Sequence, residues 1–376
     1  MRWKRGLLLL AAPVFLILGA IGYGFVNQPV IADVVVGESP ASDPVAGPKE
    51  VDEVKVPAHV ALPEEVRGIY WTAATPRVSR ADDLLAYMAE TGLNAVVIDV
   101  KMDNGEVAWP PEEMMPRIAE LGFYRIARVA VMRDSAFALA HPSAALYSAG
   151  GGLWRDKTGA AWLDPAAPEV VENAIAIGRE AYARGFDEVQ FDYIRFASDG
   201  ALSSIRYPVY DFTETKSEVM AKFFETAGGA MRADGIPVSF DLFGMTFETS
   251  DDFGIGQRLV DAFPNADFVS PMVYPSHYAS GFQGYANPAL YPYEVVTHSL
   301  TFGLGILSSN FGLPDTEITP KFRPWIQDFD IGAVYTAERI EAQIKAARDA
   351  GASGWMLWNA RNVYEPAKYV EQVGQE

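Results

Sequence analysis

Two acidic residues stand in the middle of apolar stretches, where an unpaired carboxylate is costly to bury. Asp192 lies in residues 185–198, a stretch rich in aromatic and branched residues that predicts a strand. Asp241 lies in a similar stretch, residues 239–244. Such an acid either faces a polar cleft at the end of a strand or forms a structural ion pair, which Arg195 would provide for Asp192.

Other polar and aromatic residues fall at the ends of further predicted strands. Each has a structural alternative, since a residue such as Trp358 is often core and a lone His277 is often a loop residue. Alternation allows only one of the neighbours Gln327 and Asp328 to point inward. The residues at these strand ends, which we interpret as substrate-binding, are Asp99, Lys101, Arg195, Tyr274, His277, Gln327, Asp328, Trp358 and Asn359.

Paired carboxylates beside tryptophans and tyrosines suit glycoside hydrolysis, in which one acid protonates the leaving oxygen and the other attacks or activates water. We expect Arg195 to keep Asp192 ionised as nucleophile or electrostatic stabiliser. Asp241 lies among Phe240 and Leu242, where poor solvation would raise its pKa and suit a general acid. The two roles could be exchanged. Lys101 is likewise expected to keep Asp99 ionised.

A long loop over residues 133–168 carries two further candidates for the substrate site. Loops of this length inside a compact domain are usually functional. Trp154 and Trp162 flank a turn in it, and we expect them to form a wall of a sugar cleft or to pack in the core.

Eight predicted strands, most of them followed by a helix, must position these residues. This alternation of strands and helices predicts an α/β fold, a (β/α)8 TIM barrel, whose catalytic groups come from the carboxyl ends of several strands. The alternative is a doubly wound open sheet, which would need a glycine-rich turn after the first strand, and residues 71–76 contain no glycine. The predicted strands cover residues 67–72, 94–101, 124–132, 185–198, 237–245, 268–274, 323–329 and 354–361.

Composition excludes several classes of protein. The net charge of −19 argues against nucleic acid as a partner, because phosphate binding needs a basic face. The chain has no cysteine, so disulfides and thiolate metal sites are excluded. It has only four histidines, none paired at helical ligand spacing, and we expect neither a metal nor a cofactor.

The N-terminus resembles a membrane signal. Basic residues precede an apolar run over residues 7–26 that is long enough to span a bilayer. We therefore expect residues 1–26 to be an uncleaved signal anchor in a bacterial cytoplasmic membrane, residues 27–62 to be a disordered linker rich in proline and acids, and residues 63–376 to be a barrel facing the periplasm or cell surface. The alternative is a cleaved signal peptide and a secreted protein.

Several motifs, in order, resemble a bacterial family of proposed glycoside hydrolases. That family was first defined as a domain of unknown function and is assigned a TIM-barrel fold. The resemblance covers residues 66–364 and implies a carbohydrate-active barrel, without specifying the sugar. The motifs that carry it are Asn94-Ala-Val-Val-Ile-Asp-Val-Lys101, Phe191-Asp-Tyr-Ile-Arg-Phe196, Ser270-Pro-Met-Val-Tyr-Pro-Ser-His-Tyr278, Arg323-Pro-Trp-Ile-Gln-Asp-Phe329 and Gly354-Trp-Met-Leu-Trp-Asn359.

A comparison with chitinase-like barrels points to a different mechanism from theirs. Their fourth strand resembles Asp-Gly-x-Asp-x-Asp-x-Glu, and here Gln190 and Ile194 replace the middle Asp and the final Glu, on the face that alternation gives to Asp192. The second acid must then come from another strand, and Asp241 is the best candidate. The function expected is hydrolysis of an envelope or extracellular polysaccharide. The alternatives are a tethered barrel that binds glycan without cleaving it and a metal-dependent deacetylase.

Overall fold

The computed structural model describes residues 58–364. The predicted anchor, most of the predicted linker and the last twelve residues, 365–376, lie outside the described residues. Within residues 58–364, no helix is both long and apolar enough to cross a membrane.

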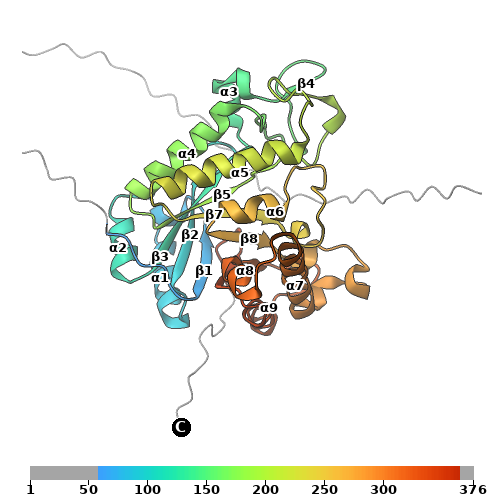
Figure 1. Ribbon diagram of the computed structural model, residues 1–376. Helices are drawn as coiled ribbons and strands as arrows, with labels where there is room; N and C mark the ends of the chain where they lie inside the picture. The colour runs from blue at the N-terminus through green and yellow to red at the C-terminus, as the bar shows by residue number, and fades with distance from the viewer. Residues whose placement is uncertain (1–57, 365–376) are drawn as a thin grey trace, which may run out of the picture.

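Eight parallel strands close into a barrel, which confirms the predicted (β/α)8 fold and excludes the open sheet (Figure 1). Around the barrel the strand order is β1-β10-β9-β8-β7-β5-β3-β2. A separate pair of short antiparallel strands, β4 and β6, lies outside the barrel. The strands are β1 (Val66–Trp71), β2 (Ala95–Lys101), β3 (Tyr124–Ala130), β4 (Tyr147–Ser148), β5 (Glu188–Asp192), β6 (Ile205–Arg206), β7 (Val238–Phe243), β8 (Phe268–Met272), β9 (Trp325–Gln327) and β10 (Gly354–Trp358).

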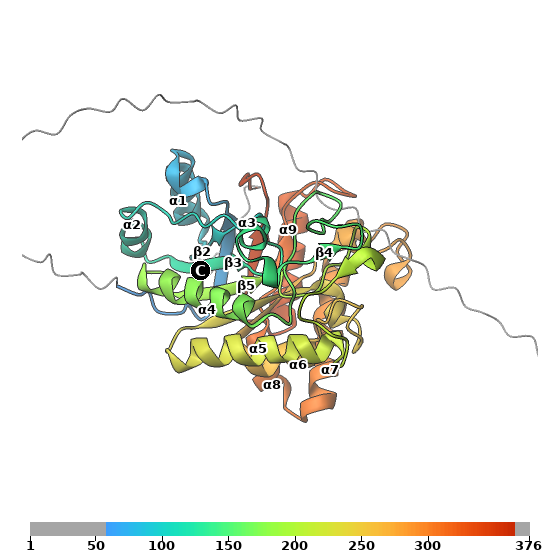
Figure 2. The same cartoon turned by 90° about the horizontal axis from the view of Figure 1, so that it is seen from above.

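Helices surround the strands, and both views show α4 and α5 side by side across the outer surface of the barrel (Figures 1 and 2). Helix α5 begins at a capping box, in which Thr215 and Glu218 satisfy each other's backbone amides. The α-helices are α1 (Arg80–Thr91), α2 (Met114–Glu120), α3 (Ser135–Ala140), α4 (Pro168–Ala183), α5 (Lys216–Ala233), α6 (Leu259–Ala262), α7 (Pro292–Phe311), α8 (Asp315–Ile318) and α9 (Ala337–Asp349).

The structure differs from the sequence prediction in two connections. The helix expected over residues 252–262 is reduced to the single turn of α6. The excursion 133–168, expected as a loop, contains α3 and β4. β4 pairs with β6, so the excursion is tied to the connection that follows β5.

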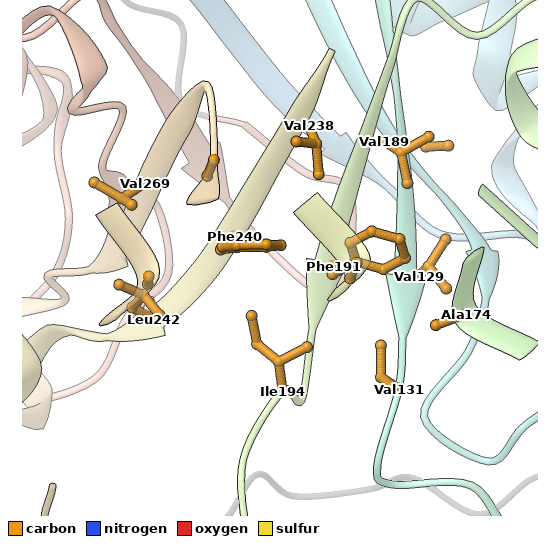
Figure 3. Close-up of a cluster of buried hydrophobic side chains, with 14 of the residues drawn as sticks. Val129, Val131, Ala174, Val189, Phe191, Ile194, Val238, Phe240, Leu242 and Val269 are labelled. Carbon is orange, nitrogen blue, oxygen red and sulfur yellow. The ribbon is translucent and has the colours of Figure 1, made fainter. Parts of the chain in front are cut away.

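Apolar side chains form two clusters, one on each side of the strands. The larger cluster fills the space between strands and helices, where Phe191, Ile194 and Phe240 meet branched side chains of neighbouring elements (Figure 3). The smaller cluster, which includes Tyr124 and Met356, lies inside the barrel. This division follows from the pleat, since alternate residues of a strand face opposite sides.

The amino-terminal half of the barrel interior is closed by a buried ion pair. Arg323 donates two hydrogen bonds of 2.8 Å to Glu188, and neither side chain is exposed. Ser239 donates a further bond of 2.6 Å to Glu188. Since these side chains fill this part of the described barrel, a ligand has room toward the carboxyl ends of the strands.

Candidate active site

The two predicted catalytic acids lie side by side on adjacent strands. β5 pairs with β7 in a register that ends at Phe191 and Phe240, and Asp192 and Asp241 are the next residues along. Neighbouring strands are about 4.7–4.9 Å apart. Both carboxylates therefore stand at the same level inside the barrel.

Arg128 of β3 joins these acids. Its Nε lies 3.0 Å from Oδ2 of Asp192 and 3.8 Å from Oδ2 of Asp241. Those two oxygens therefore cannot lie farther apart than the sum of these distances. Its Nη1 donates a 2.6 Å hydrogen bond to Asp99, and its Nη2 also contacts Asp192.

A pocket of about 140 Å³ opens at these side chains. Its walls combine the two acids with two arginines and several aromatic rings, a composition that suits a sugar, whose faces stack on rings and whose hydroxyls bind charged groups. The lining residues are Arg128, Asp192, Tyr193, Arg195, Asp241, Phe243, Met272, Tyr274, Trp325 and Trp358.

The environments of the two acids differ. Burial, and next the charge of Asp192, raise the pKa of Asp241 well above its usual range, although Arg128 and Trp325 oppose this. Trp325 donates a 2.7 Å hydrogen bond to Oδ1 of Asp241, while Oδ2 has no hydrogen-bond partner within residues 58–364. Asp192 instead accepts bonds on both oxygens, from Arg128 and from the amide of Tyr193 at 2.5 Å. The arrangement can hold one protonated and one ionised carboxyl group.

Asp99 and Lys101 do not form the predicted pair. Lys101 instead forms an ion pair with Asp134 at 2.6 Å and donates a 2.6 Å hydrogen bond to the carbonyl of Ala130, because the register of β2 shifts between Asp99 and Lys101. Asp99 instead accepts from Arg128 and, at 2.5 Å, from Tyr70. Burial raises the pKa of Asp99 in spite of these contacts. Neither Asp99 nor Lys101 lines the pocket.

The strand that carries Asp192 ends earlier than predicted. Tyr193 adopts a left-handed backbone conformation with φ of 52°, which is uncommon for a residue with a side chain and is held by its surroundings. The alternation expected beyond Asp192 is therefore wrong, since Tyr193 lines the pocket and Ile194 packs in the outer cluster (Figure 3). Arg195 lines the pocket but forms no ion pair with Asp192, so Arg128 takes the role predicted for Arg195.

Trp154 and Trp162 are core residues of the excursion 133–168, and the interpretation of either one as a wall of the cleft is wrong. Each is only 2 % exposed, and neither lines the pocket. The indole of Trp154 donates to the carbonyl of Ala201, and that of Trp162 donates to Asp156. Trp162 still affects the site indirectly, because the guanidinium of Arg195 stacks over its ring at 4.8 Å.

The remaining predicted residues divide into two groups. Tyr274 and Trp358 line the pocket, and Trp358 stacks on Tyr70 at 4.1 Å. His277 lies in an exposed turn, where its ring meets those of Tyr274 and Phe329. Gln327, Asp328 and Asn359 do not line the pocket.

These three residues form hydrogen bonds with main-chain atoms of the loops that follow the strands. Gln327 accepts from the amide of Ser276 and donates to the carbonyl of Phe329 at 2.8 Å. Asn359 donates to the carbonyls of Asp328 and Val363. The Asp328 amide in turn bonds the carbonyl of Trp358. They support the loops that follow β8, β9 and β10.

Sequence reasoning missed several pocket residues, of which Arg128 is the most important. Alternation from Tyr124 places Arg128 on the inward face of its strand, between apolar neighbours, and that position was the available signal. Trp325, Phe243 and Met272 lie on strands that were predicted, but their residue types alone indicate core.

A closed (β/α)8 barrel with paired carboxylates and aromatic rings at the carboxyl ends of its strands has the architecture of a glycosidase. The sequence matches, over residues 68–364, the family described as "Putative glycosyl hydrolase domain", and the chain belongs to this family. The predicted resemblance is thereby confirmed.

The chain also matches solved structures, one of which has a similar overall fold. The glycoside hydrolase domain of PgaB (BpsB) from Bordetella bronchiseptica is 14% identical, with a TM-score of 0.55 over 78% of this chain and 94% of that one. A hypothetical protein from Ruminiclostridium thermocellum is 27% identical, with a TM-score of 0.42 over 50% of this chain and 98% of the other. No curated protein matches the sequence.

Proposed function

We propose that this protein is a retaining glycoside hydrolase, with Asp192 as nucleophile and Asp241 as general acid and then base. The observation that carries the proposal is the placement of both carboxylates at one level on adjacent strands, within reach of a single Arg128 nitrogen. Retention needs carboxyl groups about 5–5.5 Å apart, whereas inversion needs about 6.5–9.5 Å to admit a water. The spacing of neighbouring strands and the limit set by Arg128 both favour the shorter separation.

The differing environments support this division of roles. Asp192 accepts hydrogen bonds on both oxygens, from a guanidinium and from a backbone amide, which fix the carboxylate in the pocket as a nucleophile requires. Asp241 has a raised pKa and an oxygen free to carry the proton. Asp192 would attack the anomeric carbon while Asp241 protonates the departing oxygen, and Asp241 would then activate the water that releases the sugar.

The experiment is a hydrolysis screen of the full-length protein on bacterial envelope and extracellular polysaccharides, with new reducing ends as the readout. Proton NMR of the first product then reports its anomeric configuration. We expect the configuration of the substrate to be retained. Inversion would contradict the roles given to the two acids, and binding of a glycan without any cleavage would favour a non-catalytic barrel.

We also propose that the barrel is tethered to the outer side of the cytoplasmic membrane, on the strength of the basic residues that precede the apolar run 7–26. A reporter that is active only in the cytoplasm, fused after Glu50, should give no signal. Strong reporter activity would contradict this orientation.

A further inference from the structure

Arg195 is a buried cation in the wall of the pocket. The residue is 7 % exposed, and within residues 58–364 no carboxylate lies within ion-pair distance of its guanidinium. Three aromatic rings hold the guanidinium in place, those of Phe243 at 4.4 Å, Trp162 at 4.8 Å and Tyr193 at 5.4 Å. Rings stabilise a cation, but they do not replace the hydrogen bonds that it loses on burial.

The hydrogen bonds of Arg195 leave one edge of the guanidinium unused. Nη1 donates 3.1 Å bonds to the carbonyl of Phe196 and to Oγ of Ser198, which together use both of its hydrogens. Nε and Nη2 have no acceptor in the part of the chain that the structure describes. This pair forms a planar edge with two parallel donors, which matches the two oxygens of a carboxylate.

Catalysis by the two acids does not account for this edge. Both oxygens of Asp192 already accept bonds, from Arg128 and from the Tyr193 amide. Asp241 is bound by Trp325 and lies nearest to Arg128. Arg195 nevertheless lines the same pocket as both acids.

We propose that the free edge of Arg195 binds a carboxylate of the substrate, so that the glycan cleaved by this protein contains uronic acid. The inference rests on the proposed function for its relevance to cleavage, but binding can be tested without cleavage. A single sugar acid is the right probe, because a long polyanion would also be repelled by the net charge of −19.

The experiment measures the affinity of the full-length protein for D-glucuronate and D-galacturonate by titration calorimetry. Each is compared with its methyl ester, which has nearly the same shape without the charge. We expect at least one acid to bind about 10-fold or more tightly than its ester, because a bidentate charged bond is lost in the ester. Equal affinity of acid and ester for both sugars would overturn the inference.

Two variants assign the effect to Arg195. Arg195→Gln should abolish the preference for the acid, and Arg195→Lys should lose most of it, because an ammonium keeps the charge but not the planar edge. Arg117→Gln, which removes an exposed arginine, is the matched control and should keep the preference. A preference that survives in Arg195→Gln, or tighter binding of glucose 6-sulfate than of either uronate, would overturn the assignment.

The outcomes for the two proposals are separable. Cleavage of neutral glycans alone, with no preference for uronates, would remove the carboxylate site and leave the glycosidase. A preference for uronates that depends on Arg195, without cleavage of any glycan, would support the carboxylate site and contradict the proposed reaction.

Discussion

Replacement of Arg128 by methionine should destabilise the barrel strongly, and by an amount that grows with pH. Arg128 is 6 % exposed and contacts Asp99, Asp192 and Asp241, so its removal leaves buried carboxylates without their cation. Breaking a buried ion pair from one side costs about 3–5 kcal/mol. In a domain of this size that loss lowers the melting temperature by about 5–8 °C.

The pH dependence has a definite sign. Burial already raises the pKa values of Asp99 and Asp241, and Arg128 opposes this, so its removal raises both pKa values further above their unfolded values. The folded variant then binds protons more tightly than the unfolded chain, so its stability is highest below the unfolded pKa values, near pH 4, and falls as pH rises. The deficit relative to wild type should therefore be smaller at pH 5 than at pH 8.

Urea unfolding followed by circular dichroism at both pH values measures the deficit. Arg117→Met is the control, because Arg117 pairs with Asp82 on the surface, where both side chains are about half exposed, and the change should stay within about 0.5 kcal/mol. A loss below about 1 kcal/mol at pH 8, or an equal loss at both pH values, would refute the role given to Arg128.

Two further predictions concern the acid and the excursion. Turnover should fall as pH rises through the raised pKa of Asp241, because a general acid must be protonated. The pH profile of kcat/KM in Asp241→Asn should lack this fall at alkaline pH. A fall that persists unchanged in the variant would mean that another group is responsible. Trp154→Ala should cost about 3–5 kcal/mol in urea unfolding because the side chain is buried, whereas Phe302→Ala, at a residue 45 % exposed, should cost much less; similar losses would contradict the core placement of Trp154.

The barrel and the adjacency of its two acids were predictable from the sequence because they depend on regular features. Strand and helix patterns alternate, and consecutive strands of such a fold are neighbours, so acids at matching positions of β5 and β7 must meet. The partner of each carboxylate was not predictable in the same way. Lys101 and Arg195 are close in sequence to acids, yet the structure directs each elsewhere and uses Arg128 from a third strand.

Local backbone conformation and side-chain burial also limited what could be predicted from the sequence. The left-handed Tyr193 has no local sequence signal, since its conformation is fixed by tertiary contacts, and with it Ile194 and Arg195 take the opposite faces from those that alternation predicts. A tryptophan in a long loop stacks on a ligand or fills a core with the same side chain. Trp154 and Trp162 are core residues because the excursion 133–168 folds onto itself and onto the connection after β5, and the sequence pattern does not reveal these contacts.

The most direct test of the central claim is the rate of glycan hydrolysis by Asp192→Asn and Asp241→Asn, with Asp83→Asn as a control for the same substitution at an exposed position. Each active-site change removes a charge or a proton donor while keeping the shape of the side chain. The account predicts that both active-site variants lose turnover by about 100-fold or more while they stay folded and bind glycan, and that Asp83→Asn cleaves at the wild-type rate. Near-normal turnover in either Asp192→Asn or Asp241→Asn would contradict the paired-carboxylate mechanism.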